Sequence, residues 1–330
     1  MIIELVFICN LLLFAIWLEV IGMQIGALIV AAGMSSRTGD FKPMMNIGSI
    51  SVAQRVVATL SQAGISKIVM VTGYNATMLE RHLSGNGIIF LRNEHYATTQ
   101  MFDSVKIGLD YLKDKCDKIL FTPVDVPLFT SKTVRRLLDS NALLAVPVCE
   151  NVQGHPVLIS NHLIPEILND CGEMGLRGAI DRCSADLRQV PVEDFGTIQD
   201  ADTPEDFSKL LEYHNSQLVR PVVSVSLAKE KPFFDSKIAI LLMLIDETRS
   251  IRAAGQRMQL SYSSCWNIIR TLESQLDYPL IERTQGGAGG STSVLTERGR
   301  ELLERYNAYE QLLKDKANEL YDQYFGGLFE

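Results

Sequence analysis

The sequence predicts an α/β domain built on a doubly wound, mostly parallel sheet, followed by a small winged helix-turn-helix domain. Two observations carry this prediction. From about residue 25 to 210, short and almost wholly apolar runs alternate with amphipathic stretches, as parallel strands alternate with crossover helices. From Phe233 the sequence predicts successive helices, then a glycine-rich loop, then a long last helix. A chain of 330 residues is long enough for two such domains.

In the first domain, five apolar runs are expected to form strands and four amphipathic stretches to form helices. The runs are apolar along most of their length, so helices should cover both faces of the sheet. The expected strands are residues 26–33, 67–73, 87–93, 118–125 and 141–149. The expected helices are residues 51–64, 76–83, 101–115 and 132–140.

The second domain is expected to be helical around a winged motif. Its expected elements are helices at 235–249, 250–259 and 261–276, a wing near 283–295 and a last helix from Thr296. Residues 215–232 contain two prolines and show no helical period, which predicts a linker with at most one short strand. The chain thus divides into an N-terminal segment (1–22), a first domain (23–214), the linker and a second domain (233–330).

The N-terminal segment is almost wholly apolar, and only Glu4 and Glu19 carry charge in it. It is about long enough to cross a bilayer. However, no Lys or Arg flanks it closely, and it lacks the basic start of a signal peptide. Met23 directly precedes the first expected strand. Two interpretations are open: translation begins at Met23, or the segment is a membrane anchor. We favour the first and expect a cytoplasmic protein.

The composition is that of a globular protein, with 47% hydrophobic and 21% charged residues. The net charge of −8 argues against general binding of polyanions, although a small basic module could still bind DNA because electric fields are local. The six cysteines are scattered and none forms C-x-x-C, so we expect neither a zinc site nor a redox pair. Scattered thiols suit a reducing compartment.

The loop after the first expected strand has the composition of a phosphate-binding loop. In VAAGMSSRTGDFKP, residues 30–43, small and hydroxyl side chains lead to Arg37 and Lys42. Gly33 permits a close approach of the backbone to a ligand, and the two cations would neutralise phosphate charge. The Walker A pattern is absent, which indicates a different kind of phosphate site. The loop by itself is equally consistent with a turn that carries solvated charges.

Two acidic segments are candidate ligands of Mg²⁺. Asp125 ends an apolar strand between Pro123 and Pro127, where a carboxylate can bind a metal or stand in a turn. Asp200 and Asp202 precede an expected helix, so helix capping is the alternative there. Carboxylates on separate loops could hold one Mg²⁺ that bridges the phosphates of a nucleotide.

Four motifs in this order resemble those of a known family. They are AAGMSSRTGDFK, PVDVP, GHPVLIS and DADTPEDF. The first is similar to the A-A-G-x-S-x-R-x-G-x-x-K signature of MobA-like nucleotidyltransferases, which include the molybdenum cofactor cytidylyltransferases and guanylyltransferases. The others are similar to the D-x-P metal motif, the Gly-His-Pro loop and the D-x-D-T-P-E-D motif of the same family. The resemblance covers residues 24–212.

The resemblance implies that a substrate phosphate attacks the α-phosphate of a nucleoside triphosphate and that pyrophosphate is released. It also implies Mg²⁺ as cofactor. The residues implied to bind the nucleotide are Ala32, Gly33, Ser35, Arg37, Lys42 and Ser104, with Arg37, Lys42 and Asp125 as catalytic residues. The residues implied to hold Mg²⁺ are Asp125 and Asp202, with Asp200 as a further candidate. The residues implied to bind the acceptor are His155 and Arg177, and a His155 packed beside Pro156 is the alternative.

The sequence departs from the family pattern in places. Gln100 replaces a family glycine, so we expect that loop to be rebuilt around Asp103 and Ser104, and Thr38 replaces the usual methionine. The A-A-G form of the first motif favours CTP over GTP. Sugar-phosphate and choline-phosphate relatives use similar loops, so molybdopterin cofactor is the expected acceptor but not the only candidate.

In the second domain, SIRAAGQRMQLSYSSCWNIIRTLESQL is a helix-turn-helix candidate, with its second helix beginning near Ser261. Such a helix presents its first residues to the major groove of DNA. The expected DNA-binding residues are Tyr262, Ser263, Ser264, Asn267 and Arg270, with Arg283 and Arg298 of the wing region near phosphates. Trp266 and Ile269 are expected to face the core.

The segments SYSSCWNIIRTLE and ERTQGGAGGSTSVLTERGRELL resemble the DNA-binding domain of ModE, a molybdate-responsive regulator, and more distantly the LysR-type winged helices. Ser263 stands where a basic residue is expected, and residues 233–310 carry nine Lys and Arg against ten Asp and Glu. DNA affinity from counterion release should therefore be modest. A winged helix kept for dimerisation is the alternative, and we expect a homodimer paired through the last helix.

Both domains point to molybdenum. The leading hypothesis is an enzyme that joins CTP to molybdopterin cofactor, fused to a DNA-binding regulator. The alternatives are a regulator whose first domain only senses nucleotide or cofactor, and a transferase for another phosphorylated acceptor. The presence of Arg37, Lys42, Asp125 and Asp202 favours an enzyme, because a pure sensor could lose them.

Overall fold

The structure is a computed structural model that describes most of the chain from Met23 to Leu328. The ranges outside the description are residues 1–22, 34–40, 85–86, 201–210, 213, 216–220, 285–291, 326–327 and 329–330. The apolar segment 1–22 therefore lies outside the described residues. Among the helices that are described, none combines the length and the apolarity needed to cross a membrane.

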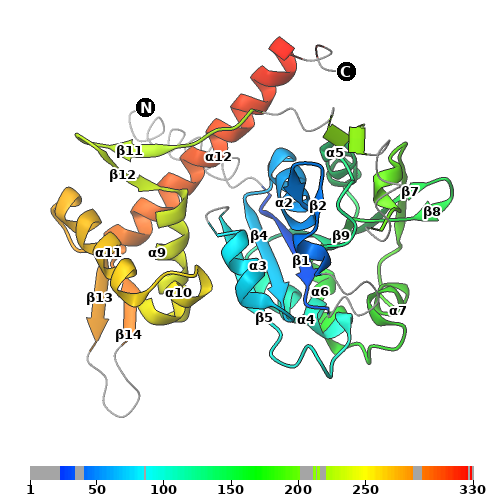
Figure 1. The fold of residues 1–330 in the computed structure, drawn as a ribbon, viewed down its shortest axis with the longest axis horizontal. Coiled ribbons are helices and arrows are strands. Elements are labelled where there is room, and N and C mark those ends of the chain that lie inside the picture. Colours follow the sequence, from blue (N-terminus) through cyan, green and yellow to red (C-terminus); the bar gives the residue numbers. More distant parts are fainter. Residues whose placement is uncertain are drawn as a thin grey trace, which may run out of the picture.

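The first part of the chain forms an eight-stranded sheet with the order β10-β7-β9-β6-β1-β4-β5, and the short β8 pairs with β7 (Figure 1). The strands are β1 (Ile25–Ala31), β4 (Lys67–Thr72), β5 (Ile88–Arg92), β6 (Lys118–Pro123), β7 (Leu144–Cys149), β8 (Val152–Gln153), β9 (Val157–Ser160) and β10 (Arg188–Pro191). β1 pairs in parallel with β4 and β6, whereas β9 runs antiparallel to β6 and β7. The prediction of a mostly parallel sheet is confirmed.

Helices cover both faces of this sheet, as the apolar strands require. Along β1, Leu28 and Val30 belong to the apolar cluster on one face, while Ala27 and Ile29 belong to the cluster on the other. The first cluster is completed by α4 (Met101–Leu112), α6 (Ile164–Asn169) and α7 (Gly175–Asp181). The second is completed by α2 (Val52–Gln62), α3 (Ala76–His82) and α5 (Ser131–Asp139). The sheet is therefore doubly wound, and side chains alternate between two buried cores.

Local side-chain chemistry sets where α2 begins. A short hairpin of β2 (Asn46–Ile47) and β3 (Ile50–Ser51) leads directly into this helix. The Ser51 hydroxyl accepts a hydrogen bond from the backbone N–H of Gln54 at 3.2 Å, and the Gln54 side chain accepts one from the Ser51 N–H at 2.9 Å. This reciprocal capping box satisfies backbone donors that the first helical turn leaves without partners.

The second part of the chain forms the expected helices, wing and last helix. Its elements are β11 (Ser226–Ala228), β12 (Pro232–Asp235), α9 (Ser236–Thr248), α10 (Ile251–Arg257), α11 (Tyr262–Leu276), β13 (Ile281–Thr284), β14 (Thr292–Leu295) and α12 (Glu297–Phe325). Within the described part of residues 215–231 there is one short strand, β11, as expected, and it forms an antiparallel hairpin with β12, which was not predicted. Phe234 on β12 is buried against Tyr306 of α12, and the Tyr306 hydroxyl donates to the Val225 carbonyl at 2.8 Å. These contacts hold the hairpin against the last helix.

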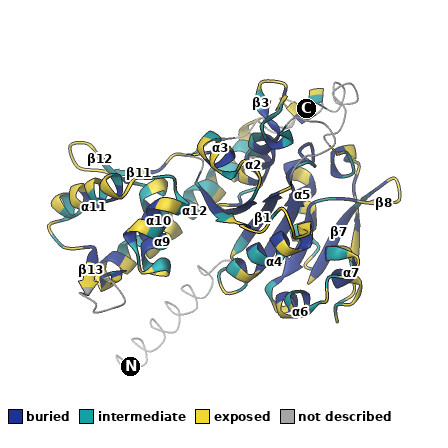
Figure 2. Ribbon diagram, turned by 60° about the horizontal axis from the view of Figure 1, so that its bottom comes forward, coloured by how far each residue is buried: buried dark blue, intermediate teal, exposed yellow. Residues whose placement is uncertain are grey.

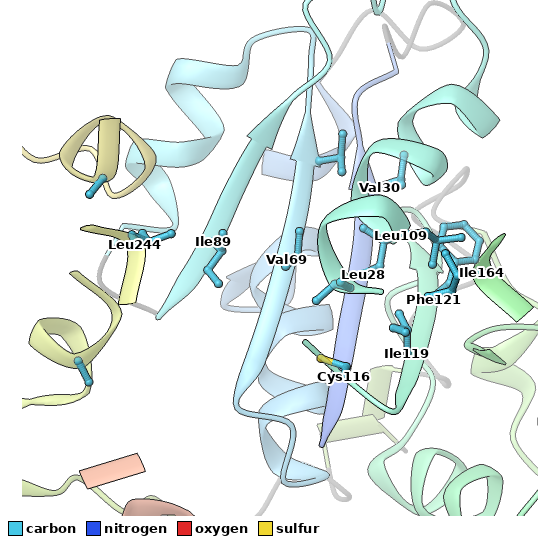
Figure 3. Close-up of a cluster of buried hydrophobic side chains, with 14 of the residues drawn as sticks. Leu28, Val30, Val69, Ile89, Leu109, Cys116, Ile119, Phe121, Ile164 and Leu244 are labelled. Carbon is cyan, nitrogen blue, oxygen red and sulfur yellow. The ribbon is translucent and has the colours of Figure 1, made fainter. Parts of the chain in front are cut away.

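The two parts pack directly against each other. The apolar cluster on the α4 face of the sheet continues into α9, so that Leu28, Ile89 and Leu244 belong to one cluster (Figure 3). At its rim the Tyr111 hydroxyl of α4 donates to Glu247 of α9 at 2.7 Å. The helical part therefore rests on the β5 edge and the α4 side of the sheet.

Candidate active site and nucleic-acid interface

The expected phosphate loop begins where β1 reaches its carboxyl end. Gly33 is exposed, and a Cβ placed on it would meet no heavy atom within 4 Å among the described residues. Ser35 and Arg37 lie outside the described residues. Lys42 opens a short 3-10 helix, Lys42–Met44, that follows the loop. The described residues thus leave the space above the Gly33 backbone open, as a phosphate that binds backbone N–H groups requires.

Three loops meet at this edge of the sheet because Gly73 has no side chain. A Cβ on Gly73 would lie 2.6 Å from the Ala32 carbonyl oxygen and 2.7 Å from Cβ of Tyr96. The N–H of Tyr74 donates to that same Ala32 carbonyl at 3.2 Å. The loops after β1, β4 and β5 are therefore tied together, and Ala32 lies in their shared, buried centre.

An aromatic row borders the same loops, and sequence reasoning missed it. The ring centroids of Phe41 and Tyr74 are 5.8 Å apart, and those of Tyr74 and Tyr96 are 6.3 Å apart. Phe41 directly precedes Lys42, so the row begins beside a candidate phosphate-binding residue. Rings that are not fully buried can contact a planar heterocycle. The signal in the sequence was an aromatic residue after each strand end, which is too common to be specific.

Asn93 organises the loop after β5, and sequence reasoning also missed this residue. Its side-chain amide is 4% exposed and donates to Thr99 Oγ1 at 2.9 Å and to Ser104 Oγ at 3.0 Å, while its Oδ1 accepts from the His95 N–H. Ser104 is only 1% exposed, and its hydroxyl oxygen accepts the hydrogen bond from the Asn93 side chain. The role of Ser104 as a nucleotide ligand stays a prediction.

Gln100 caps α4 at the point where the family has a glycine. Its backbone N–H donates to Asp103 Oδ2 at 2.8 Å, and Asp103 is the third residue of the helix. The expected change in this loop thus takes the form of a capping box. Asp103 is exposed, and its carboxylate accepts a hydrogen bond from the Gln100 backbone N–H. The N-terminal end of α4 faces the loops that border the phosphate site.

Asp125 lies close to the phosphate loop because β6 is the direct neighbour of β1. The register pairs Val30 with Pro123, and the Val124 N–H donates to the Val30 carbonyl at 3.0 Å. Asp125 follows immediately and is half-buried between two buried valines. Asp200 is exposed, and Asp202 lies outside the described residues. Within the described ranges, no group of three or more His, Cys, Asp or Glu side chains could hold a metal.

His155 lies at the same edge, because β9 pairs with β6 and His155 precedes β9. Its ring packs edge-on to Phe121 at 5.6 Å, and its Nδ1 is buried and finds no hydrogen-bond partner in the described part of the chain. Burial lowers the pKa of His155 to about 4, so the ring is neutral near pH 7. Arg177 is exposed on α7. The His155 ring thus packs against Phe121, and the role of His155 at the acceptor stays a prediction.

In the helical part, α10 and α11 form the expected helix-turn-helix. Ser261 caps α11, and its hydroxyl accepts from the Ser264 N–H at 3.1 Å. The exposed candidates for DNA contact are Tyr262, Ser263, Asn267, Arg270 and Arg283, and Ser264 is half-buried. Ile269 is fully buried, as expected. Trp266 was expected to face the core, but it is only half-buried. The guanidinium groups of Arg270 and Arg283 lie over its ring.

The fold and the loops at the sheet edge define the first part of the chain as a nucleotidyltransferase domain and the second as a winged helix-turn-helix domain. Residues 27–189 match the MobA-like NTP transferase domain, and residues 240–300 match the bacterial regulatory helix-turn-helix protein of the LysR family. The chain therefore joins a MobA-like NTP transferase domain to a LysR-type helix-turn-helix domain.

Each domain has curated relatives. The chain is 29% identical over 187 residues to the molybdenum cofactor cytidylyltransferase of Escherichia coli, a match that covers 56% of this chain and 93% of that protein. It is 31% identical over 94 residues to the DNA-binding transcriptional dual regulator ModE of Escherichia coli, which covers 28% of this chain and 36% of that protein. The chain thus spans only about a third of ModE.

One solved structure shows the same fold as the first domain. It is a nucleotidyl transferase from Methanothermobacter thermautotroptrophicus, with a TM-score of 0.50 and 19% identity, covering 59% of this chain and 98% of that chain. At this identity the likeness concerns the fold alone.

Proposed function

We propose that the transferase domain moves CMP from CTP onto the phosphate of molybdopterin cofactor, with release of pyrophosphate, and that the second domain binds DNA. The observation that carries this proposal is that Gly33 and Asp125 follow neighbouring strands at one sheet edge, while Lys42 directly follows Phe41, whose ring contacts Tyr74 at the same edge. In open α/β sheets, ligands bind at the carboxyl ends of the strands. Relatives of the two domains are named for molybdenum cofactor synthesis and for ModE, which supports the acceptor.

The reaction is a transfer of a nucleotidyl group between phosphates. An oxygen of the acceptor phosphate forms a bond to the α-phosphorus of CTP. The bond from that phosphorus to the oxygen that bridges the α- and β-phosphates breaks, and pyrophosphate leaves with the electron pair. Backbone N–H groups near Gly33 and the cations of Arg37 and Lys42 would bind the triphosphate and stabilise the charge that develops on it.

The residues present fit a Mg²⁺ ion that binds together with the nucleotide. Asp125 offers a hard carboxylate oxygen that is half-buried at a strand end. Mg²⁺ commonly takes one or two carboxylates and completes its shell with substrate phosphates and water. We propose Asp125 and Asp202 as these carboxylates, with Asp200 beside them. When bound, Mg²⁺ would neutralise the phosphates and favour departure of pyrophosphate.

The aromatic row of Phe41, Tyr74 and Tyr96 supports a planar substrate beside the phosphates. Both a nucleobase and a pterin present a flat ring system that can lie against such side chains. On the opposite side, His155 and Arg177 are proposed to contact the acceptor. The neutral His155 would do so through a hydrogen bond, since burial disfavours its charged form.

A second candidate function is a regulator whose transferase domain only senses nucleotide or cofactor. The direct packing of α9 on the transferase core favours some influence of one domain on the other. The presence of Lys42 and Asp125 favours an enzyme, because binding alone does not require the full catalytic set. Binding of CTP with no transfer to any phosphorylated acceptor would favour the sensor.

Asp125 and Lys42 provide the test of the site. Asp125→Asn keeps the shape of the side chain but removes its charge, so transfer should fall about 100-fold or more, as for loss of one group that stabilises developing charge. Lys42→Ala should weaken binding of CTP and slow transfer. Asp139→Asn on the exposed end of α5 is the matched control and should leave the rate unchanged. Full activity of Asp125→Asn would contradict the metal assignment.

We also propose a homodimer that pairs through α12. Tyr309, Leu312, Leu320 and Tyr324 are exposed on this helix. At 100° per residue these four positions fall within about a third of the helix circumference, so they form one apolar stripe. A second copy of the same helix could cover this stripe.

A further inference from the structure

One surface of the winged helix-turn-helix domain combines two aromatic rings with three arginines. Tyr262 and Trp266 of α11 are in edge-to-face contact, with ring centroids 6.3 Å apart and an interplanar angle of 82°. Arg252 of α10, Arg270 of α11 and Arg283 of β13 all place their guanidinium groups over these rings. We call this set of five residues the arginine–aromatic surface.

Arg283 is the most closely held of the three arginines. Its guanidinium carbon lies 4.3 Å from the centre of the Trp266 ring, and its Nη2 donates to the Tyr262 hydroxyl at 3.1 Å. Arg252 lies 5.7 Å from the Tyr262 ring centre, and Arg270 lies 5.8 Å from that of Trp266. A guanidinium over an aromatic face is attracted by the ring and loses side-chain freedom. The rings therefore fix charges that would otherwise move in solvent.

The charges on this surface are available to an outside partner. No acidic side chain in the described part of the chain forms an ion pair with Arg252, Arg270 or Arg283, whereas Arg257 pairs with Glu247 and Arg300 with Asp246. The domain is nearly neutral in total, so these three arginines concentrate positive charge at one place. Local field, and not net charge, decides whether an anion binds.

The surface also lies where a duplex can reach it. In two views, α11 and the β13–β14 hairpin lie at the end of the molecule away from the sheet (Figure 1, Figure 2). The three arginines come from the first helix of the motif, the recognition helix and the first strand of the wing. In winged and helix-turn-helix proteins, these elements approach the phosphates on the two sides of a major groove. A phosphodiester backbone is a partner that matches this arrangement.

We propose that Tyr262 and Trp266 form a platform that fixes Arg252, Arg270 and Arg283 for binding to duplex DNA phosphates, with Trp266 as a positioning residue. The proposal rests on the DNA-binding function proposed above and assigns new roles to Arg252 and Trp266. It also explains how a helix with Ser263 at an expected basic position can still bind DNA, because neighbouring elements supply the charge. Sequence reasoning placed Trp266 in the core and therefore missed the platform.

The test is the salt dependence of duplex binding by the full chain. A fluorescently labelled duplex of mixed sequence is titrated between about 50 and 200 mM salt. Each of R252Q, R270Q and R283Q should reduce the slope of log K against log salt by about 0.9, because one phosphate contact is lost. Arg305→Gln is the matched control, since this exposed arginine of α12 is paired with Glu301. It should keep the wild-type slope.

Trp266 is tested by replacement and by rescue. Trp266→Leu should weaken binding roughly tenfold, because two arginines lose their ring, while Trp266→Phe should recover most of the affinity. In the Trp266→Leu background, R283Q should reduce the affinity for the duplex by less than it does in the wild type, because Arg283 is no longer positioned by the ring. If Trp266 only fills space, R283Q should reduce the affinity equally in both backgrounds. Circular dichroism checks that each variant is folded. If Trp266→Leu does not fold, the arginine variants and Trp266→Phe test the platform in its place.

The outcomes separate two failures. If the wild type shows no salt-dependent binding to any duplex, the proposed DNA-binding function is wrong. If the wild type binds but the three arginine variants keep its affinity and slope, DNA binding stands and the platform is wrong. Equal costs of R283Q with and without Trp266 would overturn the positioning role of Trp266.

Discussion

Gln259, in the turn of the helix-turn-helix, donates a hydrogen bond from Nε2 to Glu80 Oε2 of the transferase domain at 2.6 Å. Glu80 is 1% exposed and also accepts from the Thr72 hydroxyl and from two nitrogens of Arg92. Arg92 in turn precedes Asn93, which organises the loop at the site. The turn that precedes the recognition helix is thus tied, through one buried carboxylate, to the strand end beside the candidate active site.

The contacts between the domains should contribute to the stability of the whole chain. Gln259→Ala should lower the free energy of unfolding by about 1 kcal/mol, and Tyr111→Phe by about 1 to 3 kcal/mol, since each removes a hydrogen bond to a carboxylate. The double variant should show nearly the sum, because the two contacts share no partner. Urea denaturation measures these values, with Gln256→Ala on the exposed face of α10 as control. If all these variants have the same free energy of unfolding as the control, the two contacts between the domains do not stabilise the chain.

Two glycines at the site should respond differently to the same change. Gly73→Ala should destabilise the protein by about 1 to 3 kcal/mol, because the new Cβ would approach the Ala32 carbonyl to 2.6 Å. Gly33→Ala should leave stability nearly unchanged, since its Cβ meets no described atom, yet it should weaken binding of CTP by filling the space for phosphate. Thermal unfolding and equilibrium binding of CTP measure the two effects. Equal loss of stability in both variants would contradict the open space above Gly33.

Stability should fall as the pH falls from about 6.5 to about 4. Burial lowers the pKa of His155 and of His214 to about 4, from an ordinary value of 6.5. In this window the unfolded state binds more protons than the folded state, so acid favours unfolding. Each histidine contributes up to about 3 kcal/mol across the window. His155→Gln should flatten the pH dependence of unfolding, and the exposed His162→Gln should not. A profile of His155→Gln as steep as the wild type would show that His155 is not buried in its neutral form.

The proposed dimer depends on the apolar stripe of α12. Leu312→Glu together with Leu320→Glu should convert a dimer into a monomer, because two charges per helix would be buried in the interface. Sedimentation velocity measures the mass, and Asn307→Glu, at an exposed position on the opposite face of the same helix, tests for a general effect of charge. A wild-type chain that sediments as a monomer at micromolar concentration would contradict the dimer.

The sequence predicted the regular parts of the fold because each rests on a local pattern. The mostly apolar run at residues 118–125 contains β6, a strand between two layers, and the serine before residue 262 caps the second helix of the helix-turn-helix. The antiparallel β9 was not predicted, since its partner β6 lies several elements earlier in the chain. The hairpin of β11 and β12 was not predicted because both strands are short and the second begins at Pro232. The contact of Arg55, which donates to Asn215 Oδ1 at 2.9 Å, and that of Glu80 with Gln259 were also missed. Both Arg55 and Glu80 are buried charged residues that depend on partners brought together only by folding.

The candidate site was predicted to the extent that it follows strand ends. Gly33 and Asp125 lie at one edge because the parallel strands β1 and β6 place their carboxyl ends together, whereas Lys42 lies in a short 3-10 helix further along the chain. Asn93 and Tyr74 were missed, because a single Asn or Tyr after a strand is common and only contacts reveal its use. Trp266 was assigned to the core from its helical position, and nothing local to α11 indicates the arginine that reaches it from β13.

The proposed cytidylyltransferase activity is measured as nucleotidyl transfer to molybdopterin cofactor. CTP, GTP and ATP, each labelled at the α-phosphate, are incubated in turn with the chain from Met23, Mg²⁺ and the cofactor. We expect a labelled dinucleotide product and released pyrophosphate with CTP, and far less product with GTP or ATP. Binding of CTP with no labelled product from molybdopterin cofactor would show that the proposed transfer is wrong and would favour a sensor or a different phosphorylated acceptor.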